Sequence, residues 1–334
     1  MRPEDAGSYL YDLASGYQSA IVVIAANSLD LFTVLDGKNL SARDLAELLK
    51  TDVDGTSRLA DALTSLGFLE KTDGKYRNAP AFRKFLVRGQ PAYQGDIFRH
   101  HEGIHSNWAK LAEIVRTGKP PEEDGDPRSP MDTDAFIRGM ANIAVGSSRE
   151  LADALDLRGV KRVLDIGGGP GVYAIEMLRR LPQATGVVLD LEEPLRIASE
   201  FVENAGMADR IELRAGDLTQ VDLGEGFDLV LISNIIHSFT LEENAALMGR
   251  VAKALTPSGK VVVKDFLMNE DRSGPAFSAL FAINMLVGRS RGTAYTFSEI
   301  SSWMEKAGLV VIQRFPLAKN SHAIVGGKGG EKVR

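Results

Sequence analysis

A glycine-rich turn near the middle of the chain has residue types that could hold a cofactor, in the sequence Val163-Leu164-Asp165-Ile166-Gly167-Gly168-Gly169-Pro170-Gly171. Glycine tolerates positive φ and lets a ligand approach the backbone, and a helix expected over residues 173–180 would offer unpaired N–H groups in its first turn. A hydrophobic strand that ends in such a turn and opens a helix is typical of a nucleoside-cofactor site. We therefore expect cofactor contacts at Asp165, Gly167, Gly169 and Gly171.

Two classes of cofactor use a turn of this kind. Residues 169–174 fit the dinucleotide pattern G-x-G-x-x-G/A, so an NAD- or FAD-dependent oxidoreductase is one alternative. Pro170, however, has no N–H to donate to a pyrophosphate. The pattern D-x-G-G-G-x-G, which begins at Asp165, resembles motif I of the class I methyltransferases that depend on S-adenosylmethionine (SAM). SAM carries a sulfonium cation, an amino group and no phosphate, so a carboxylate at Asp165 would attract it but would repel a pyrophosphate. The turn therefore favours SAM as the cofactor.

Further acidic residues lie where the next two strands are expected to end. In an open α/β sheet, ligands bind outside the carboxyl ends of the strands. Asp190, followed by Leu191, ends the second strand, where a carboxylate can accept hydrogen bonds from ribose hydroxyls. Gly216, Asp217 and Leu218 end the third strand, where Asp217 can accept from the adenine amino group and Leu218 can pack on the ring. One such residue often only caps a helix, but carboxylates at three consecutive strand ends favour a SAM site.

A histidine and another carboxylate follow the fourth and fifth expected strands. His237 comes shortly after the strand expected over 227–232, and Asp265 ends the strand over 259–265. Because these strands are expected neighbours, the two side chains should meet beside the cofactor. An imidazole, with an ordinary pKa of about 6.5, can remove a proton from a phenol of pKa about 10, while a carboxylate orients the ring and stabilises the imidazolium. The alternative is a histidine that makes a purely structural hydrogen bond.

Strand and helix patterns alternate over the second half of the chain. Strands are expected near 162–166, 186–190, 211–215, 227–232, 259–265, 309–315 and 322–326. This alternation predicts βαβ units and a mostly parallel sheet covered by helices on both faces. The last two strands are separated by too few residues for a crossover helix, so they should pair antiparallel. The expected fold class is α/β, with a Rossmann-like sheet of seven strands.

The N-terminal part of the chain reads as short helices followed by a hairpin. Ser41 can cap one helix, the pair Thr56-Ser57 can cap a second, and Asp73-Gly74 is a favoured hairpin turn. This order predicts a winged helix, but the helix in the recognition position is acidic on balance. Because phosphate contacts need Lys and Arg, DNA binding is disfavoured. We expect a dimerisation domain, with the apolar stretches of residues 1–35 packing partly on a second subunit.

These features together resemble the class I SAM-dependent O-methyltransferases of small molecules, of the caffeate, hydroxyindole and bacterial polyketide type. The resemblance rests on the winged-helix front, DIGGGPG, Asp190, GDL and NIIHSF, and it spans nearly the whole chain. It implies that His237 is the general base, that Asp265 is its partner, and that the chain forms a homodimer. It also implies three parts: a winged-helix dimerisation domain over 1–95, linking helices that cover an acceptor pocket over 96–150, and a SAM-binding catalytic domain over 151–334.

The chain departs from the pattern of this family at three positions. Phe239 replaces a usual tryptophan, Ala294 stands where a second carboxylate is usual, and Ser233 stands where a lysine or similar polar residue touches the cofactor. Proteins that resemble this chain also methylate carbon, for example on tetrapyrroles, as well as nitrogen or sulfur, and a few bind SAM without transferring a methyl group. Methylation of another atom and a non-catalytic SAM-binding winged-helix regulator are therefore alternative functions.

Residues at helical spacing could line the acceptor pocket, although such residues are more often plain core. The candidate substrate residues are Phe136, Met140, Asn234, Phe281, Asn284 and Met285. His101 and His105 lie one helical turn apart, close to His100, a spacing that could bind a metal. Because no clear third ligand is spaced with them, we expect no metal and interpret them as a polar helix face or pocket lining.

The composition limits the remaining function classes. With 334 residues, 44% hydrophobic and 25% charged, the chain is long enough for two globular domains. The net charge of −6 and the scattered Lys and Arg argue against a nucleic-acid partner. The absence of cysteine excludes disulfides, Cys-ligated metal centres and a thiol nucleophile. The N-terminus lacks a signal-peptide pattern and the longest apolar run, Ala20 to Ala26, is too short to span a bilayer, so we expect a cytoplasmic protein with no membrane partner.

Overall fold

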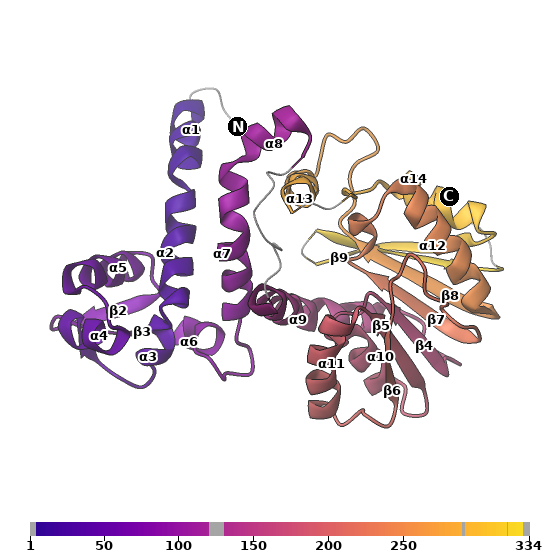
Figure 1. Ribbon diagram of the computed structural model, residues 1–334, viewed down its shortest axis with the longest axis horizontal. Coiled ribbons are helices and arrows are strands. Elements are labelled where there is room, and N and C mark those ends of the chain that lie inside the picture. The colour runs from indigo at the N-terminus through magenta and orange to yellow at the C-terminus, as the bar shows by residue number, and fades with distance from the viewer. Residues whose placement is uncertain (1–4, 120–129, 289–290, 319, 330–334) are drawn as a thin grey trace. The chain divides into compact units, whose positions relative to one another are not determined.

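The computed structural model describes residues 5–119, 130–288, 291–318 and 320–329, and the chain divides into two compact units, Met1–Gly103 and Ile104–Arg334 (Figure 1). Helix α7 (Gly95–Ala109) contains the division between them. The units are described separately.

The N-terminal unit combines helices with a small antiparallel sheet. Its helices are α1 (Ala6–Ser15), α2 (Tyr17–Ser28), α3 (Leu31–Val34), α4 (Ala42–Leu49), α5 (Val53–Ser65) and α6 (Pro80–Leu86). Its strands are β1 (Leu40–Ser41), β2 (Leu69–Thr72) and β3 (Lys75–Asn78), in the order β1-β3-β2. The expected hairpin turn is confirmed, because β2 pairs with β3 across Asp73 and Gly74, which both have positive φ.

One of the two expected helix caps in this unit is correct and the other is wrong. Ser41 accepts a hydrogen bond from the backbone N–H of Asp44 at 3.2 Å and caps α4. Helix α5 begins earlier than expected, because Asp52 accepts from the N–H of Gly55 at 2.8 Å. Thr56 therefore lies inside the helix, where its hydroxyl donates to the carbonyl of Asp52.

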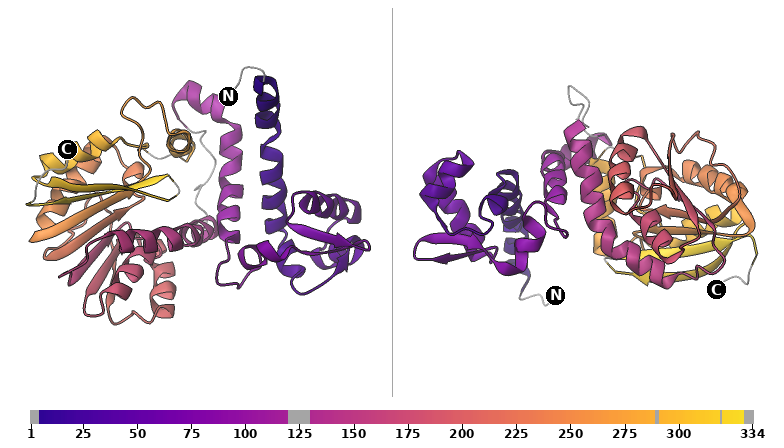
Figure 2. Two further views of the ribbon diagram at one scale, coloured as in Figure 1. Left: turned by 180° about the vertical axis from the view of Figure 1, so that it is seen from behind. Right: turned by 90° about the horizontal axis from the view of Figure 1, so that it is seen from below.

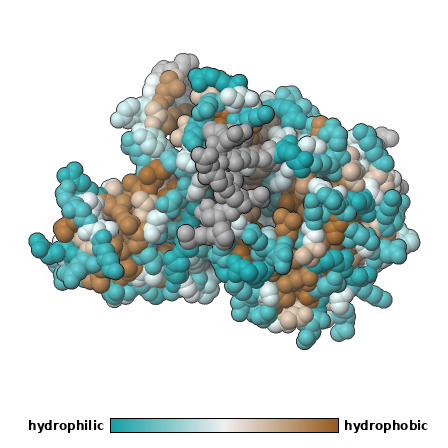
Figure 3. Space-filling view, viewed as in Figure 1, coloured by the Kyte–Doolittle hydropathy of each residue, from teal (hydrophilic) through white to brown (hydrophobic). Residues whose placement is uncertain are grey.

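Helix α1 leaves its apolar side chains at the surface, and none of its residues is buried. Figure 3 shows apolar side chains on the surface of this unit. The exposed large apolar residues of its first two helices are Tyr9, Leu10, Tyr11, Leu13 and Tyr17. An exposed row of this kind is typical of a surface that packs on another molecule.

The second unit is built on a seven-stranded sheet, which confirms the expected fold class. Its strands are β4 (Arg162–Ile166), β5 (Thr185–Asp190), β6 (Ile211–Ala215), β7 (Phe227–Ser233), β8 (Leu255–Asp265), β9 (Val310–Leu317) and β10 (Ser321–Gly327). Their order is β6-β5-β4-β7-β8-β10-β9. Strands β4 to β8 pair parallel, and β10 pairs antiparallel with both β8 and β9.

Helices cover both faces of this sheet (Figures 1 and 2). Helices α9 (Pro130–Ala154), α10 (Val172–Arg180) and α11 (Glu192–Asn204) pack on the face that carries Val163, Val188 and Val262. Helices α12 (Leu241–Ala254) and α14 (Phe297–Lys306) pack on the face that carries Leu164, Val230 and Val263. The same unit contains α8 (Leu111–Thr117), the 3₁₀ helix η2 (Ile236–Ser238) and α13 (Ala276–Val287).

Parallel pairing brings five strand ends to one edge of the sheet. Strands β4 to β8 end at Ile166, Asp190, Ala215, Ser233 and Asp265. Residues just beyond these ends come from distant parts of the sequence but lie along the same edge. Within the described ranges, no helix has both the length and the apolar composition needed to span a membrane.

Candidate active site

The glycine turn connects the end of β4 to the start of α10. Gly167, Gly169 and Gly171 have φ values of +63°, +51° and +73°, a backbone conformation that residues other than glycine rarely adopt. A Cβ atom at position 167 would lie 2.7 Å from Cγ1 of Ile235, whereas one at position 169 would meet no atom within 4 Å. The turn is thus packed against the protein on one side and open on another, where a ligand can approach its backbone.

Asp165 is completely buried beneath this turn. Its Oδ2 atom accepts a hydrogen bond from the N–H of Ala174 at 3.2 Å, while Oδ1 has no hydrogen-bond partner among the described residues. Burial is the main cause that raises the pKa of the Asp165 carboxyl to about 7. A buried acceptor with an unused oxygen suits a ligand that brings a cation or an N–H donor, as SAM does.

Asp190 lies half-buried at the end of β5 and contacts the same turn. Its two carboxylate oxygens accept hydrogen bonds from the N–H groups of Gly169 and Leu191, both at 2.7 Å. Burial raises the pKa of Asp190. A carboxylate has about four acceptor positions, so these two bonds leave capacity for hydroxyl donors such as those of a ribose.

The loop after β6 carries the predicted adenine contacts. Asp217 accepts hydrogen bonds from the N–H and the hydroxyl of Thr219, both at 2.8 Å, and these bonds lower the pKa of Asp217. Leu218 is buried. Arg250 of α12 donates to the carbonyl of Leu218 and, at 2.8 Å, to that of Val221.

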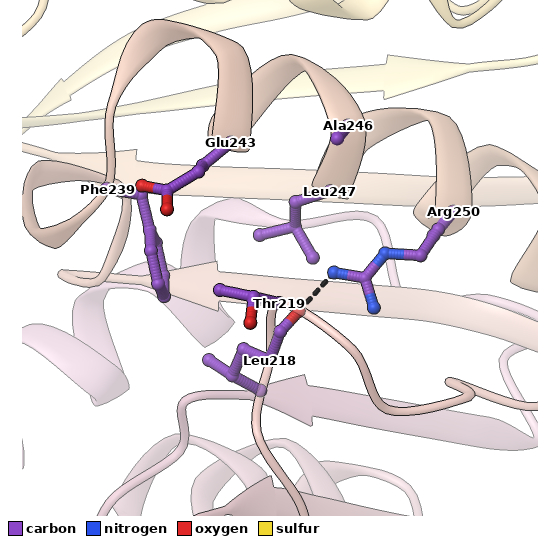
Figure 4. Close-up of a pocket in the computed structure, with 7 residues that line it drawn as sticks. All are labelled: Leu218, Thr219, Phe239, Glu243, Ala246, Leu247 and Arg250. Atoms are coloured by element: carbon purple, nitrogen blue, oxygen red, sulfur yellow. Dashed lines mark hydrogen bonds between the residues drawn. The ribbon is translucent and has the colours of Figure 1, made fainter.

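A pocket lies between this loop and α12, and Figure 4 shows Leu218 and Leu247 pointing into it. It is lined by Leu218, Thr219, Phe239, Glu243, Ala246, Leu247 and Arg250. The guanidinium of Arg250 reaches back from the helix to the loop at one end of this pocket (Figure 4). Arg250 therefore ties the position of the loop to that of α12.

His237 and Asp265 meet as the strand order predicts. His237 lies in η2, after the end of β7, and Asp265 ends the neighbouring strand β8. The Nδ1 atom of His237 is 2.9 Å from Oδ1 and 3.0 Å from Oδ2 of Asp265. The side chains are only 12% and 3% exposed, so this polar pair is largely shielded from water.

The segment that carries His237 is fixed by its surroundings. Asn244 donates from its amide to the carbonyl of Ile236 at 2.9 Å, and Tyr295 donates from its hydroxyl to the carbonyl of Phe239. Gly292 packs so closely that a Cβ atom there would lie 2.2 Å from the carbonyl oxygen of His237. Helix α12 begins with a capping box, since the side chains of Thr240 and Glu243 each accept a hydrogen bond from the other's backbone N–H.

An aromatic cluster packs on the histidine. The ring of Phe281, on α13, lies 4.7 Å from the imidazole of His237 at an interplanar angle of 84°. Phe266 lies 4.8 Å from Phe281 and 4.9 Å from Phe277, between ring centroids. Of the predicted substrate residues, Phe281 is therefore beside His237, and an apolar aromatic surface adjoins the polar pair.

The other predicted substrate residues have varied surroundings. Asn234 accepts a hydrogen bond from Nζ of Lys264 at 2.9 Å, and Asn284 accepts one from Nε1 of Trp108 at 3.0 Å. Phe136 and Met140 lie on α9, with Phe136 40% exposed, and Met285 lies on α13. Within the described part of the chain, no cluster of three or more His, Cys, Asp or Glu side chains could hold a metal ion.

Sequence reasoning missed several polar and aromatic residues of this edge. Lys264 is buried beside Asn234, and the hydroxyl of Tyr173 lies 2.8 Å from that of Ser147 on α9. A signal for Lys264 was present, because a charged residue interrupts the apolar run of β8 one position before Asp265. No comparable local pattern marks the partners of Tyr173.

Two family models match this chain. A model of the O-methyltransferase domain matches residues 108–310, and a model of the O-methyltransferase dimerisation domain matches residues 11–88. One model therefore falls within each of the two units described above.

Similar proteins extend over most of the chain. It is 34% identical to 3-hydroxy-5-methyl-1-naphthoate 3-O-methyltransferase of Streptomyces sahachiroi, with 90% of this chain and 88% of that protein covered. It is 32% identical to the tetracenomycin polyketide synthesis 8-O-methyl transferase TcmO of Streptomyces glaucescens, with 91% of each covered. The solved structure of human N-acetylserotonin methyltransferase in complex with SAM matches with a TM-score of 0.87 and 26% identity, over 99% of this chain and 100% of that chain.

Proposed function

Because the chain belongs to the family of SAM-dependent O-methyltransferases that act on small molecules, we propose that it methylates a hydroxyl group of a small aromatic acceptor, with His237 as the general base. As part of this proposal, residues 1–95 serve dimerisation, residues 96–150 link the domains and cover the acceptor, and residues 151–334 hold the cofactor.

The observation that carries the proposal is the contact between His237 and Asp265 at the sheet edge. A carboxylate at Nδ1 favours the tautomer with the proton on that nitrogen, so Nε2 is the nitrogen that accepts a proton. When an acceptor hydroxyl loses its proton to Nε2, the imidazolium that forms is stabilised by the adjacent carboxylate. This assigns a chemical role to both members of a pair that is shielded from water.

The residues for the cofactor form a consistent set along the same edge. Bound SAM supplies a methyl group that is activated by its sulfonium. Asp165 suits its cationic end, because an oxygen of this buried carboxylate has no protein partner among the described residues. Asp190 suits the ribose hydroxyls, and Asp217 with Leu218 suits the adenine. Ser233 is a further candidate contact, because its hydroxyl is also buried and has no hydrogen-bond partner among the described residues.

The aromatic character of the acceptor is supported by two observations. Phe266, Phe277 and Phe281 form an aromatic surface next to His237, and aromatic rings pack favourably on such a surface. The relative from Streptomyces sahachiroi is named for a hydroxylated naphthoate. A phenolic hydroxyl group also suits a histidine base better than an aliphatic hydroxyl does, because the phenol is the stronger acid.

A panel of phenols, hydroxynaphthoates, indoles and tetrapyrroles, incubated with methyl-labelled SAM, tests the proposal. We expect label in an aromatic acceptor, with product NMR showing a new O–CH₃ group. A methyl group on carbon, nitrogen or sulfur would overturn the assignment of O-methylation. Tight SAM binding without turnover on any acceptor, together with DNA binding, would instead support a regulator.

A further inference from the structure

A buried lysine stands at the same edge and is not used by the proposed reaction. Lys264 is 2% exposed, and it is the one lysine that is buried among the residues that the structure describes. Taking an ammonium group out of water is costly unless polar or charged groups surround it. The burial of Lys264 at this position therefore calls for a physical explanation.

The neighbours of Lys264 belong to the cofactor side of the site. In the parallel pairing of β7 with β8, Lys264 is the register partner of Ser233. Asn234 contacts Lys264 twice, since its N–H donates to the carbonyl of Lys264 at 2.8 Å and its amide oxygen accepts from Nζ at 2.9 Å. Asn234 has a φ of +53°, a backbone conformation in which it is held by these contacts.

Two aromatic rings lie near the ammonium of Lys264. Its nitrogen lies 6.0 Å from the ring centroid of Tyr173 and 5.2 Å from that of Phe266. Tyr173 lies in the first turn of α10, which follows the glycine turn. Burial is the main cause that raises the pKa of Tyr173 to about 12, and the negative charges of Asp165 and Asp265 add to it. Lys264 thus lies among residues that connect the glycine turn with the aromatic cluster.

The charges of SAM complement this arrangement. The amino-acid end of SAM carries an ammonium and a carboxylate next to the sulfonium, so a site needs groups of both signs. Asp165 can balance the positive charge of SAM. None of the other predicted cofactor residues carries a positive charge that could bind the carboxylate of SAM. A lysine ammonium is a compact charge with three N–H donors, and it forms strong hydrogen bonds to carboxylates.

We infer that Lys264, positioned by Asn234, binds the α-carboxylate of SAM. The hydroxyl of Ser233, the register partner of Lys264, is suited to accept or donate a further hydrogen bond at the same place. In this arrangement β8 supplies the charge that β7 lacks at position 233. The inference rests on SAM being the cofactor, and it does not depend on His237 acting as the base.

Calorimetric titration of the full-length protein with two ligands tests this inference. One ligand is S-adenosylhomocysteine, and the other is its decarboxylated analogue, which keeps the amino group. In Lys264→Met, we expect S-adenosylhomocysteine to bind about 10- to 100-fold more weakly, the loss typical of a charged hydrogen bond. The decarboxylated analogue should bind the variant and the unmodified protein equally well. Lys264→Arg should retain part of the affinity for S-adenosylhomocysteine.

Lys260→Met is the matched control, because Lys260 lies on the same strand and is partly exposed. It should bind both ligands normally. An equal loss for both ligands in Lys264→Met, repeated in Lys264→Gln, would show a structural role and overturn the inference. Unchanged binding of both ligands with a raised KM for the acceptor would assign Lys264 to an acidic group of the acceptor instead. Normal turnover by a His237 variant would refute the proposed base but leave this binding pattern intact.

Discussion

The carboxylate of Asp265 contacts Nδ1 of His237 almost symmetrically, with 2.9 Å to one oxygen and 3.0 Å to the other. Two acceptors on one ring nitrogen fix both the tautomer and the plane of the imidazole. The opposite nitrogen, Nε2, is thereby turned into the one basic position of the ring. This relationship leads to the first two predictions.

Replacing His237 by Ala should lower kcat by about 10²–10⁴-fold, the usual contribution of a general base. Affinity for S-adenosylhomocysteine, measured by calorimetry, should stay nearly the same because a base acts only in the transition state. Unchanged turnover with the true acceptor would refute base catalysis by this histidine.

Replacing Asp265 by Ala should lower kcat less than the His237 change does, because the imidazole remains and only its orientation and charge support are lost. Ala294, which is buried, has no carboxyl group that could take over this role. Steady-state kinetics at several pH values would measure the effect. If the variant kept full activity, another group would have to hold His237.

Replacing Asp190 by Ala should weaken SAM binding by about 3 kcal/mol, or about 100-fold, because two ribose hydroxyls would lose a charged acceptor. The N–H of Gly169 would lose its 2.7 Å hydrogen bond at the same time. The exposed residue Glu193, three positions further along, provides the control Glu193→Ala. Equal affinities of the two variants in calorimetry would contradict the assignment of Asp190.

SAM binding should release a proton below about pH 7, because the raised pKa of Asp165, about 7, keeps its carboxyl protonated in the free protein. A bound cation favours the ionised carboxylate, so affinity should rise with pH from about 5 to 7 and then level off. The folding stability of the unliganded protein should change with pH in the opposite direction to this affinity. An unfolded Asp loses its proton near pH 4, so stability falls as pH rises from about 4 to 7.

Calorimetry in two buffers with different ionisation enthalpies counts the protons that are released when SAM binds. The variant Asp165→Asn cannot ionise and should release none. Equal proton counts for this variant and the unmodified protein at pH 6 would show that Asp165 does not bind the cationic end of SAM.

The row of exposed apolar residues on α1 should form part of the dimer interface, since Leu10 and Leu13 are 66% and 59% exposed. The double change Leu10→Glu and Leu13→Glu should therefore weaken the dimer, which sedimentation at micromolar concentration would show. Val115→Glu, at a similarly exposed valine on α8, is the control. A double variant that stays as dimeric as the control would exclude this surface from the interface.

The pattern of the sequence was sufficient to predict the sheet and several local contacts. The strand ends at Asp190 and Asp265 and the hairpin turn at Asp73 and Gly74 depend on alternation and spacing over a few residues, which can be read directly. The predicted cap of α5 at Thr56 was wrong because Asp52, four positions earlier, is the N-cap residue of this helix. The pairing of Ser233 with Lys264 depends on the register between two strands, and no local pattern encodes that register.

The close approach of Gly292 to the carbonyl of His237 also limits which positions can be mutated to change acceptor specificity. Any side chain at position 292 would push on the main chain of His237, so a mutant library should leave this glycine unchanged. Phe277 and Phe281 project from a separate helix and can be varied to reshape the aromatic surface. The main-chain support of His237 is thus separate from these aromatic side chains, so they can be replaced without removing that support.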